Sequence, residues 1–144
     1  MHSFTTHRKV EFSDTDMAGI AHFSRFFAFM ENAEMEFLNS LGVGFVAQYL
    51  DLDGRRVGWP RVAASCEYLA PVRFGEELLV QLHVVRKGTK SLTYRFEIEV
   101  AGKLVATGTL TTVCCILKID GTLESIPIPE KIAAVIQEAP AASV

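Results

Sequence analysis

The chain contains few cysteines and no excess of positive charge, and both features exclude certain classes of protein. It has three cysteines in 144 residues, and two of them, Cys114 and Cys115, are adjacent, which does not suit an ordinary structural disulfide. No zinc-type spacing of ligands occurs, so we expect no metal site, and this cysteine usage predicts a reducing, cytoplasmic setting. Fourteen lysines and arginines against seventeen aspartates and glutamates give a formal net charge of −3. Such a balance argues against nucleic-acid binding.

Long apolar runs and common cofactor motifs are also missing. No apolar stretch approaches the length of a membrane span, and acidic residues, rather than the apolar core of a signal peptide, follow residues 1–9. The sequence contains no nucleophile-elbow serine, Walker loop or dinucleotide-binding glycine motif. We therefore expect no membrane association and no metal or redox cofactor.

The composition is that of one compact domain. A chain of 144 residues with 49% hydrophobic residues is long and apolar enough for a single core without disulfides. No internal repeat or linker divides it, and only the Ala- and Pro-rich end, residues 139–144, has the composition of a disordered tail. We predict one domain over residues 1–138.

One long helix is predicted near the N-terminus. Apolar residues recur at intervals of three and four from Phe23 to Leu41, Ser24 is a suitable N-cap, and Gly42 follows as a stop signal. A short strand is expected before the helix, over residues 7–12. Residues 13–19, between the two, are rich in turn-forming types and should form a loop.

Beyond Pro60 the hydrophobic pattern changes to period two. The alternation is clearest over residues 92–100, and residues 78–84 and 104–116 read as neighbouring strands separated by short turns. A final helix is predicted from residue 129 to residue 138. One helix followed by antiparallel strands is an α+β layout, in which the apolar face of the sheet must cover the helix.

Two carboxylates and a glycine, Asp14, Asp16 and Gly19, lie just before the predicted start of the long helix. Unpaired N–H groups at a helix N-terminus favour negative charge. The residues alone favour aspartates that stabilise a turn, which is the commoner case. The functional alternative is a carboxylate that faces a substrate carbonyl held by the N–H groups of the helix.

Two segments of the sequence favour the functional alternative. Residues 12–23 contain Asp-x-Asp-x-x-Gly followed by an aromatic helix start, and residues 60–76 contain Tyr-x-x-Pro and a Gly-Glu turn. Together they resemble the hotdog-fold thioesterases of the 4-hydroxybenzoyl-CoA thioesterase type, over roughly residues 7–117, and two motifs in the right order are more specific than one. The resemblance implies a hotdog fold, with an antiparallel sheet wrapped around one long central helix. It also implies hydrolysis of an acyl-CoA thioester.

The same resemblance assigns roles in the loop. Asp16 matches the second aspartate of the motif and would act as nucleophile or general base, while Asp14 would hold the loop. The backbone N–H of Phe23, at the helix start, would polarise the thioester oxygen. Gly19 would allow a close approach of the chain.

The helix start departs from the family pattern. Many relatives carry Tyr or His seven residues after the second aspartate, whereas here His22 lies one position early. Two interpretations stay open for His22: it orients Asp16 or contacts the acyl group, or it is a hydrogen-bonded packing residue. The pair formed by His22 and Phe23 is similar to the branch that acts on 1,4-dihydroxy-2-naphthoyl-CoA. Glu31 matches a glutamate of the family's helix and is expected to be a supporting or ion-paired residue.

Substrate-binding residues are predicted in two further places. Trp59 and Pro60 follow a polar loop and are candidates for the acyl pocket, with simple packing as the alternative. A basic turn between two strands carries solvated charges in the simplest interpretation, but the resemblance implies contacts with the phosphates of coenzyme A from Arg86, Lys87, Lys90 and Ser91.

The resemblance also implies an acyl-CoA substrate and a homodimer or homotetramer with sites between subunits. An exposed sheet edge would give a physical reason for pairing. Two alternative functions stay open: a non-catalytic acyl-CoA-binding hotdog protein, and a thioesterase that acts on acyl carrier protein substrates. The identity of the acyl group also stays open.

Overall fold

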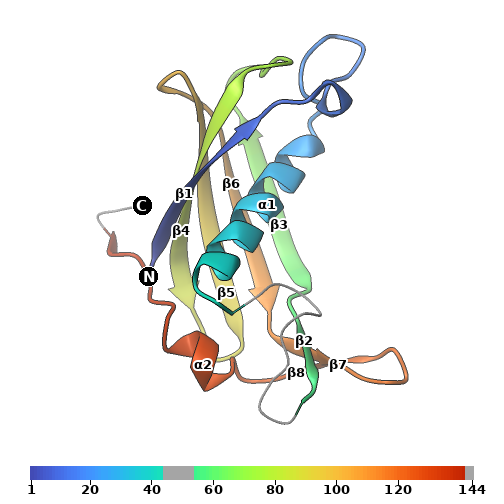
Figure 1. The fold of residues 1–144 in the computed structure, drawn as a ribbon, viewed down its shortest axis with the longest axis vertical. Helices are drawn as coiled ribbons and strands as arrows, with labels where there is room; N and C mark the ends of the chain where they lie inside the picture. The colour runs from blue at the N-terminus through green and yellow to red at the C-terminus, as the bar shows by residue number, and fades with distance from the viewer. Residues whose placement is uncertain (44–53, 142–144) are drawn as a thin grey trace.

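The structure is a computed structural model that describes residues 1–43 and 54–141. A five-stranded antiparallel sheet curves around one long helix (Figure 1), which confirms the predicted layout of a sheet around one central helix. The helix is α1 (Arg25–Ser40). The strand order in the sheet is β1 (Ser3–Lys9), β4 (Glu77–Lys87), β5 (Ser91–Val100), β6 (Lys103–Val113) and β3 (Arg61–Tyr68).

Helix α1 lies within the predicted range and buries the predicted stripe. Ser24 occupies the N-cap position, although its side chain makes no capping hydrogen bond. The residues that the helix buries against the sheet are spaced three or four apart along most of its length, as a helix with one buried face requires. Its apolar members are Phe26, Phe29, Met30, Ala33, Phe37 and Leu38.

Gly108 in β6 lets the helix approach the sheet closely. A Cβ at this position would collide with Sδ of Met30, and it would lie 2.9 Å from Cε of Met30 and 3.1 Å from the carbonyl oxygen of Ser65. The absence of a side chain at residue 108 therefore allows Met30, which is fully buried, to reach the sheet.

The predicted strand over residues 104–116 is divided between two sheets. Strand β6 ends at Val113, and the N–H of Cys114 donates to the carbonyl of Lys90 at 2.7 Å. Strand β7 (Cys115–Leu117) then pairs with β2 (Arg56–Gly58) and β8 (Leu123–Ser125) in a smaller three-stranded sheet. Residues 113–117 form a continuous apolar run across this break, so the sequence did not reveal the change of partner.

Both ends of the chain differ from the predicted boundaries. The strand predicted over residues 7–12 is β1, which starts at Ser3 and ends at Lys9, because Phe12–Asp14 forms a 3-10 turn, η1. The predicted C-terminal helix shrinks to α2 (Glu130–Ala133). The chain leaves the helix because the N–H of Gln137 donates to Met1 O and the N–H of Ala139 donates to Val84 O.

Part of the predicted tail and of the polar loop before Trp59 lies outside the described residues. These parts are residues 142–144 and residues 51–53. None of the helices in the described part of the chain is long and apolar enough to cross a membrane.

Strand β3 is an edge strand that the rest of the chain covers poorly. None of its eight residues is fully buried, whereas β4 and β5 alternate between buried and partly exposed residues. Within the described ranges, no strand pairs with the outer side of β3. Its unpaired backbone groups are thus available to another chain.

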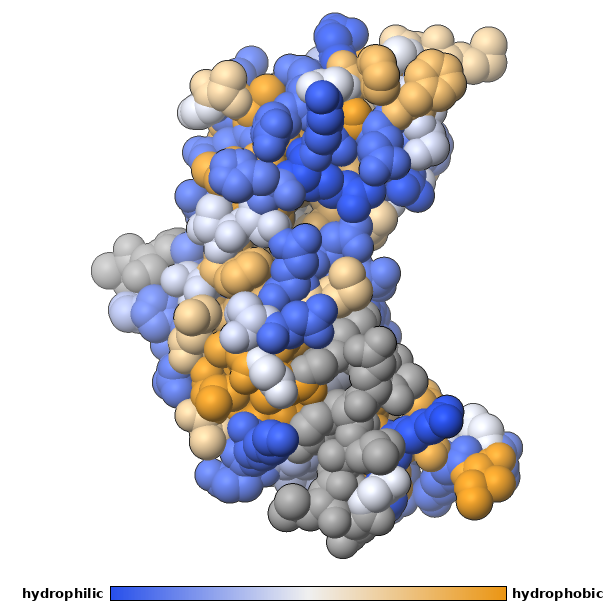
Figure 2. All heavy atoms as spheres, viewed as in Figure 1, coloured by the Kyte–Doolittle hydropathy of each residue, from blue (hydrophilic) through white to orange (hydrophobic). Residues whose placement is uncertain are grey.

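Hydrophobic side chains also reach the surface elsewhere. Figure 2 shows them over the loop before α1, at the β7–β8 hairpin and in a broader patch on the lower half of the same face. They include Phe23, which is 65% exposed, and Ile119.

Candidate active site

The loop between β1 and α1 carries the predicted catalytic residues. An isolated β-bridge joins Thr15 to Ala21 and closes the loop on itself. Gly19 lies within it at φ +79°, a left-handed conformation that favours glycine. A Cβ on Gly19 would meet nothing within 4 Å. The described part of the chain therefore does not approach this glycine closely, and its positive φ shows that the turn itself favours glycine.

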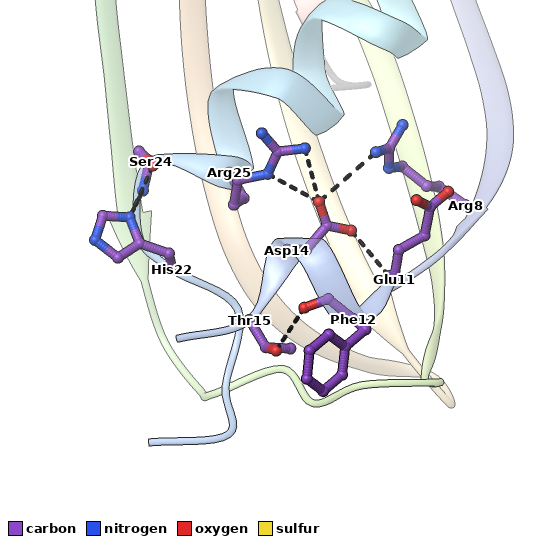
Figure 3. Close-up of polar contacts among 8 residues, drawn as sticks. All are labelled: Arg8, Glu11, Phe12, Asp14, Thr15, His22, Ser24 and Arg25. Carbon is purple, nitrogen blue, oxygen red and sulfur yellow. Dashed lines mark hydrogen bonds and ion pairs between the residues drawn. The ribbon is translucent and has the colours of Figure 1, made fainter. Parts of the chain in front are cut away.

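Asp14 is fully buried and joins the loop to the start of the helix (Figure 3). Its Oδ1 lies 2.8 Å from both Nε and Nη2 of Arg25, and Nη2 of Arg8 lies 3.9 Å away. Its Oδ2 accepts a hydrogen bond from the N–H of Glu11 at 2.9 Å. A buried carboxylate whose two oxygens are both engaged in this way is held by its partners and fixes the loop.

Asp16, by contrast, is exposed at the wall of a groove. Its Oδ1 accepts the N–H of Ala18 at 2.8 Å, an Asx turn that fixes the side chain. Its backbone N–H donates to the carbonyl of Ile20, and its carbonyl accepts the N–H of Gly19. The second carboxylate oxygen has no partner among the described residues, so it is available for chemistry.

The groove beside Asp16 is mainly apolar and has a volume of about 430 Å³. Its walls come from the loop, from the start of α1 and from the segment that follows β3. The lining residues are Asp16, Ile20, Ala21, Phe23, Phe26, Tyr68, Leu69, Ala70, Pro71 and Val72.

Phe23, just before α1, lines this groove and has a free backbone amide. In the part of the chain that the structure describes, the N–H of Phe23 donates no hydrogen bond, while its carbonyl accepts the hydroxyl of Tyr68 at 2.8 Å. A backbone N–H at a helix start is fixed in advance and suits a developing negative charge. Asp16 and Phe23 thus line the same groove.

His22 is directed toward the helix start rather than toward Asp16. Its Nδ1 lies 2.7 Å from Oγ of Ser24 and accepts the Ser24 N–H at 3.3 Å (Figure 3). Its ring stacks on that of Phe23, with centroids 4.5 Å apart. No contact between His22 and Asp16 is present among the described residues, and these bonds fit the packing interpretation better.

Glu31 lies two turns farther along α1, outside the groove. Its Oε2 is 3.4 Å from Nη2 of Arg61, which also pairs with the fully buried carboxylate of Glu34. Burial raises the pKa of Glu34 to about 7, although the Arg61 guanidinium opposes this shift. The sequence did not reveal this buried pair, because a glutamate on the buried face of a helix has no signal apart from its position between Met30 and Phe37.

The predicted substrate-binding residues just before β3 and around the β4–β5 turn lie far from Asp16 within one chain. Trp59 is buried in the core at the start of β3, whereas the groove is beside Tyr68 at its end. The β4–β5 turn lies at the end of the sheet opposite to the loop before α1 (Figure 1). Since β4 has eleven residues, ten steps of about 3.3 Å place its two ends about 33 Å apart.

The charged groups of that turn have different surroundings. The ammonium of Lys87 donates to the carbonyl of Ala133 at 2.6 Å, so part of its hydrogen-bonding capacity is used within the chain. Arg86 and Lys90 are exposed, and Ser91 opens β5. Pro60 immediately precedes β3. None of these residues lines the groove beside Asp16.

The groove walls after β3 were not assigned a role from the sequence. The Tyr-x-x-Pro motif, Tyr68 to Pro71, was the available signal, and the structure places all four of its residues at the groove. Among the described residues, no cluster of His, Cys, Asp or Glu side chains could hold a metal ion.

A sheet wrapped around one long helix, with a carboxylate loop and a free amide at the helix start, defines a thioester hydrolase of the hotdog class. Residues 10–136 match the family described as the Thioesterase-like superfamily. The chain belongs to this superfamily.

Individual relatives agree with this assignment. The 1,4-dihydroxy-2-naphthoyl-CoA hydrolase of Synechococcus sp. (strain CC9605) is 35% identical over 107 residues, which cover 72% of this chain and 70% of the relative. The crystal structure of a 1,4-dihydroxy-2-naphthoyl-CoA thioesterase from Synechocystis matches with a TM-score of 0.77 and 27% identity, over 92% of this chain and 97% of the other.

The 4-hydroxybenzoyl-CoA thioesterase from Pseudomonas sp. strain CBS-3 matches with a TM-score of 0.82 and 18% identity, over 93% of this chain and 99% of the other. At this level of identity the similarity concerns the fold. It confirms the hotdog fold that the sequence motifs predicted.

Proposed function

We propose that this protein hydrolyses an aromatic acyl-CoA thioester to the free acid and coenzyme A. The observation that carries the proposal is that Asp16 and Phe23 line one mainly apolar groove, and that the N–H of Phe23 has no partner among the described residues. A carboxylate and an oxyanion donor at one apolar site are the two groups that acyl transfer requires.

Asp16 acts through the carboxylate oxygen that the Asx turn leaves free. As a general base it takes a proton from water, whose oxygen bonds to the thioester carbon. As a nucleophile it bonds to that carbon itself, and water later hydrolyses the mixed anhydride. In both routes the C–S bond breaks, the sulfur leaves as the CoA thiolate, and the N–H of Phe23 stabilises the negative charge on the former carbonyl oxygen.

An aromatic acyl group fits the walls of the groove. The rings of Phe23, Phe26 and Tyr68 line it, and Phe26 and Tyr68 meet edge to face with centroids 5.0 Å apart. Offset and edge-to-face contacts stabilise a further ring beyond its apolar area. Two of the relatives compared above are named for a naphthoyl-CoA substrate, which supports the same choice.

We also propose that the working form is a homodimer, paired again into a homotetramer. Two copies related by a two-fold axis can pair along β3 only in an antiparallel way. The start of β3 in one chain, with Trp59 and Pro60, then approaches Tyr68 at the end of β3 in the other. Such pairing supports a pocket role for Pro60 toward a neighbour's groove, whereas Trp59 is buried in the core of its own chain and fits the packing alternative.

The position of the β4–β5 turn indicates which subunit would supply the predicted CoA contacts. Because this turn lies at the end of the sheet opposite to its own groove (Figure 1), contacts of Arg86, Lys87, Lys90 and Ser91 with a CoA phosphate would come from a neighbouring subunit. Arg86 and Lys90 are the better candidates of the four, since their charged groups are exposed.

The test is steady-state hydrolysis of a panel of aromatic and aliphatic acyl-CoA thioesters by the wild type and by Asp16→Asn. The substitution preserves the shape of the side chain but removes the base or nucleophile, and we expect kcat to fall by at least about 10²-fold. An enzyme-only blank is needed, because the three native thiols, Cys66, Cys114 and Cys115, react with thiol-detecting dyes.

Asp120→Asn is the matched control. Asp120 is also exposed and also accepts a backbone N–H two residues ahead, from Thr122 at 2.9 Å, but it lies on the β7–β8 hairpin. Its kcat should equal that of the wild type. Full activity of Asp16→Asn would refute the role of Asp16, and binding without turnover by the wild type would leave a non-catalytic acyl-CoA-binding protein.

A single-turnover reaction in ¹⁸O-labelled water separates the two routes. Hydrolysis of a mixed anhydride can place ¹⁸O in the Asp16 carboxylate, which mass spectrometry of the corresponding peptide detects. The general-base route places ¹⁸O in the released acid alone.

A further inference from the structure

The carbonyl of Phe23 is held by a residue that is distant in sequence. The Tyr68 hydroxyl, at the end of β3, donates to Phe23 O at 2.8 Å. Its ring meets that of Phe26 edge to face, with an interplanar angle of 88°. Tyr68 therefore joins the edge strand to the start of the helix, at the groove that both residues line.

The residues on either side of Phe23 are tied to Asp14, through the His22 N–H at 2.8 Å and through the Arg25 guanidinium. The Phe23 side chain, by contrast, is 65% exposed, so it does not anchor this residue in the core. The bonds from Arg25 N–H to His22 O and between His22 Nδ1 and Ser24 Oγ are local. Among the described residues, the Tyr68 hydroxyl makes the one hydrogen bond from a distant strand to the Phe23 backbone.

We propose that Tyr68 is a positioning residue for thioester hydrolysis, because its hydroxyl fixes the Phe23 backbone so that the N–H of the same residue faces the thioester oxygen. The inference rests on the function proposed above. A donor that is already oriented needs no reorganisation when negative charge develops. A small misplacement of such a group is costly in rate.

Tyr68 is suited to this role at physiological pH. Desolvation raises the pKa of its hydroxyl to about 12, so the group keeps its proton and continues to donate. A phenylalanine at the same position preserves the groove wall and the contact with Phe26 but cannot hold the carbonyl. The hydroxyl can thus be tested apart from the ring.

The experiment compares kcat and KM of Tyr68→Phe with those of the wild type on the acyl-CoA that the wild type hydrolyses best. Since one hydrogen bond of this kind contributes about 1 kcal/mol, we expect kcat to fall about fivefold, with KM changed less than about twofold. Loss of the donor itself would cost about 10²–10³-fold. The positioning effect should be smaller than that.

Tyr94→Phe is the matched control. The Tyr94 hydroxyl is buried in the core and makes no hydrogen bond in the described part of the chain, and Tyr94 does not line the groove. The control should keep the kcat and KM of the wild type. Circular dichroism and thermal unfolding of both variants establish that they are folded.

A spectroscopic measurement reports on the amide directly. An aromatic acyl-CoA bound to Asp16→Asn should show its thioester carbonyl stretch at lower wavenumber than in water, because the Phe23 N–H polarises the oxygen. In the double variant Asp16→Asn with Tyr68→Phe, this displacement should be smaller. The comparison does not depend on turnover.

The outcomes separate the two proposals. Equal kcat of Tyr68→Phe and wild type, or an unchanged carbonyl stretch in the double variant, would overturn the inference and leave the proposed function intact. A rise in KM with unchanged kcat would show that Tyr68 only lines the groove, and this result would also overturn the inference. Failure of the wild type to hydrolyse any acyl-CoA would overturn the proposed function, and the positioning role would fall with it.

Discussion

Asp14 and Arg25, eleven residues apart, form the buried ion pair that joins the candidate catalytic loop to the helix. Both Nε and Nη2 of Arg25 lie 2.8 Å from the same carboxylate oxygen. Since Asp16 is two residues after Asp14 and Phe23 is two residues before Arg25, the pair sets the relative positions of the proposed carboxylate and the proposed oxyanion donor.

Replacement of Arg25 by alanine should therefore destabilise the protein and lower its activity. It leaves the fully buried Asp14 with only the more distant Arg8 as a cationic partner, and removal of one partner of a buried pair costs about 3–5 kcal/mol. We expect the free energy of unfolding to fall by about 3 kcal/mol, at the lower end of this range, because Arg25 is itself partly exposed. Urea denaturation measures it.

Arg86→Ala serves as the control for this loss, since Arg86 is an exposed arginine and such surface changes remain within about 0.5 kcal/mol. If Arg25→Ala unfolds at the urea concentration of the wild type, the pair does not hold the loop.

Glu34 should make the stability fall as the pH rises. Its pKa in the folded state is about 7, raised from 4.5 by burial, so the folded state binds the proton more tightly than the unfolded state does. The stabilisation is complete below about pH 4.5 and is lost as the pH rises through 7. At about 1.4 kcal/mol per pKa unit, the loss is on the order of 3 kcal/mol.

The measurement is the free energy of unfolding at pH 5 and pH 8 for wild type, Glu34→Gln and the exposed control Glu130→Gln. The decrease between the two pH values should be smaller in Glu34→Gln alone. Parallel pH profiles for all three proteins would show that Glu34 does not titrate in this range.

Gly108→Ala should destabilise the core without touching the groove. The added methyl would collide with Sδ of Met30 and lie 3.1 Å from Ser65 O, and overpacking of this kind costs about 1–3 kcal/mol. In a Met30→Ala background the methyl has more room, so the same glycine substitution should cost less. A double-mutant cycle measured by chemical denaturation gives this difference, and strict additivity would contradict the predicted contact.

A negative charge added to an edge strand should weaken the dimer when it is placed on β3 but not when it is placed on β1. Ala64→Glu places a carboxylate near the middle of β3, where two-fold pairing brings the two copies of the residue close together and like charges repel. We expect the variant dimer to dissociate at a protein concentration at least about tenfold higher than that at which the wild-type dimer dissociates. Light scattering coupled to size-exclusion chromatography measures the mass.

Thr5→Glu makes the same charge change on β1, the opposite edge strand, and should leave the assembly intact. Dissociation of both variants to the same extent, or of neither, would count against pairing along β3.

The sequence alone determined the elements whose physics is local. The spacing of apolar residues located α1 to within two residues at its N-terminus, because a helix with one buried face needs that period. The alternation over residues 92–100 gave β5 for the same kind of reason. The Asp-x-Asp-x-x-Gly motif drew attention to Asp16, and the fold that it implied is confirmed.

Only the tertiary structure decided which of these residues meet. Cys114 ends β6 because its N–H bonds to Lys90, and the predicted strand continues into a second sheet. Tyr68 reaches Phe23, and Arg61 reaches Glu34, across sequence separations of 45 and 27 residues. The β4–β5 turn lies far from Asp16, although a sequence motif can assign both to one substrate. Such relations depend on the order of the strands and on the packing of the helix across them, which a periodic pattern does not encode.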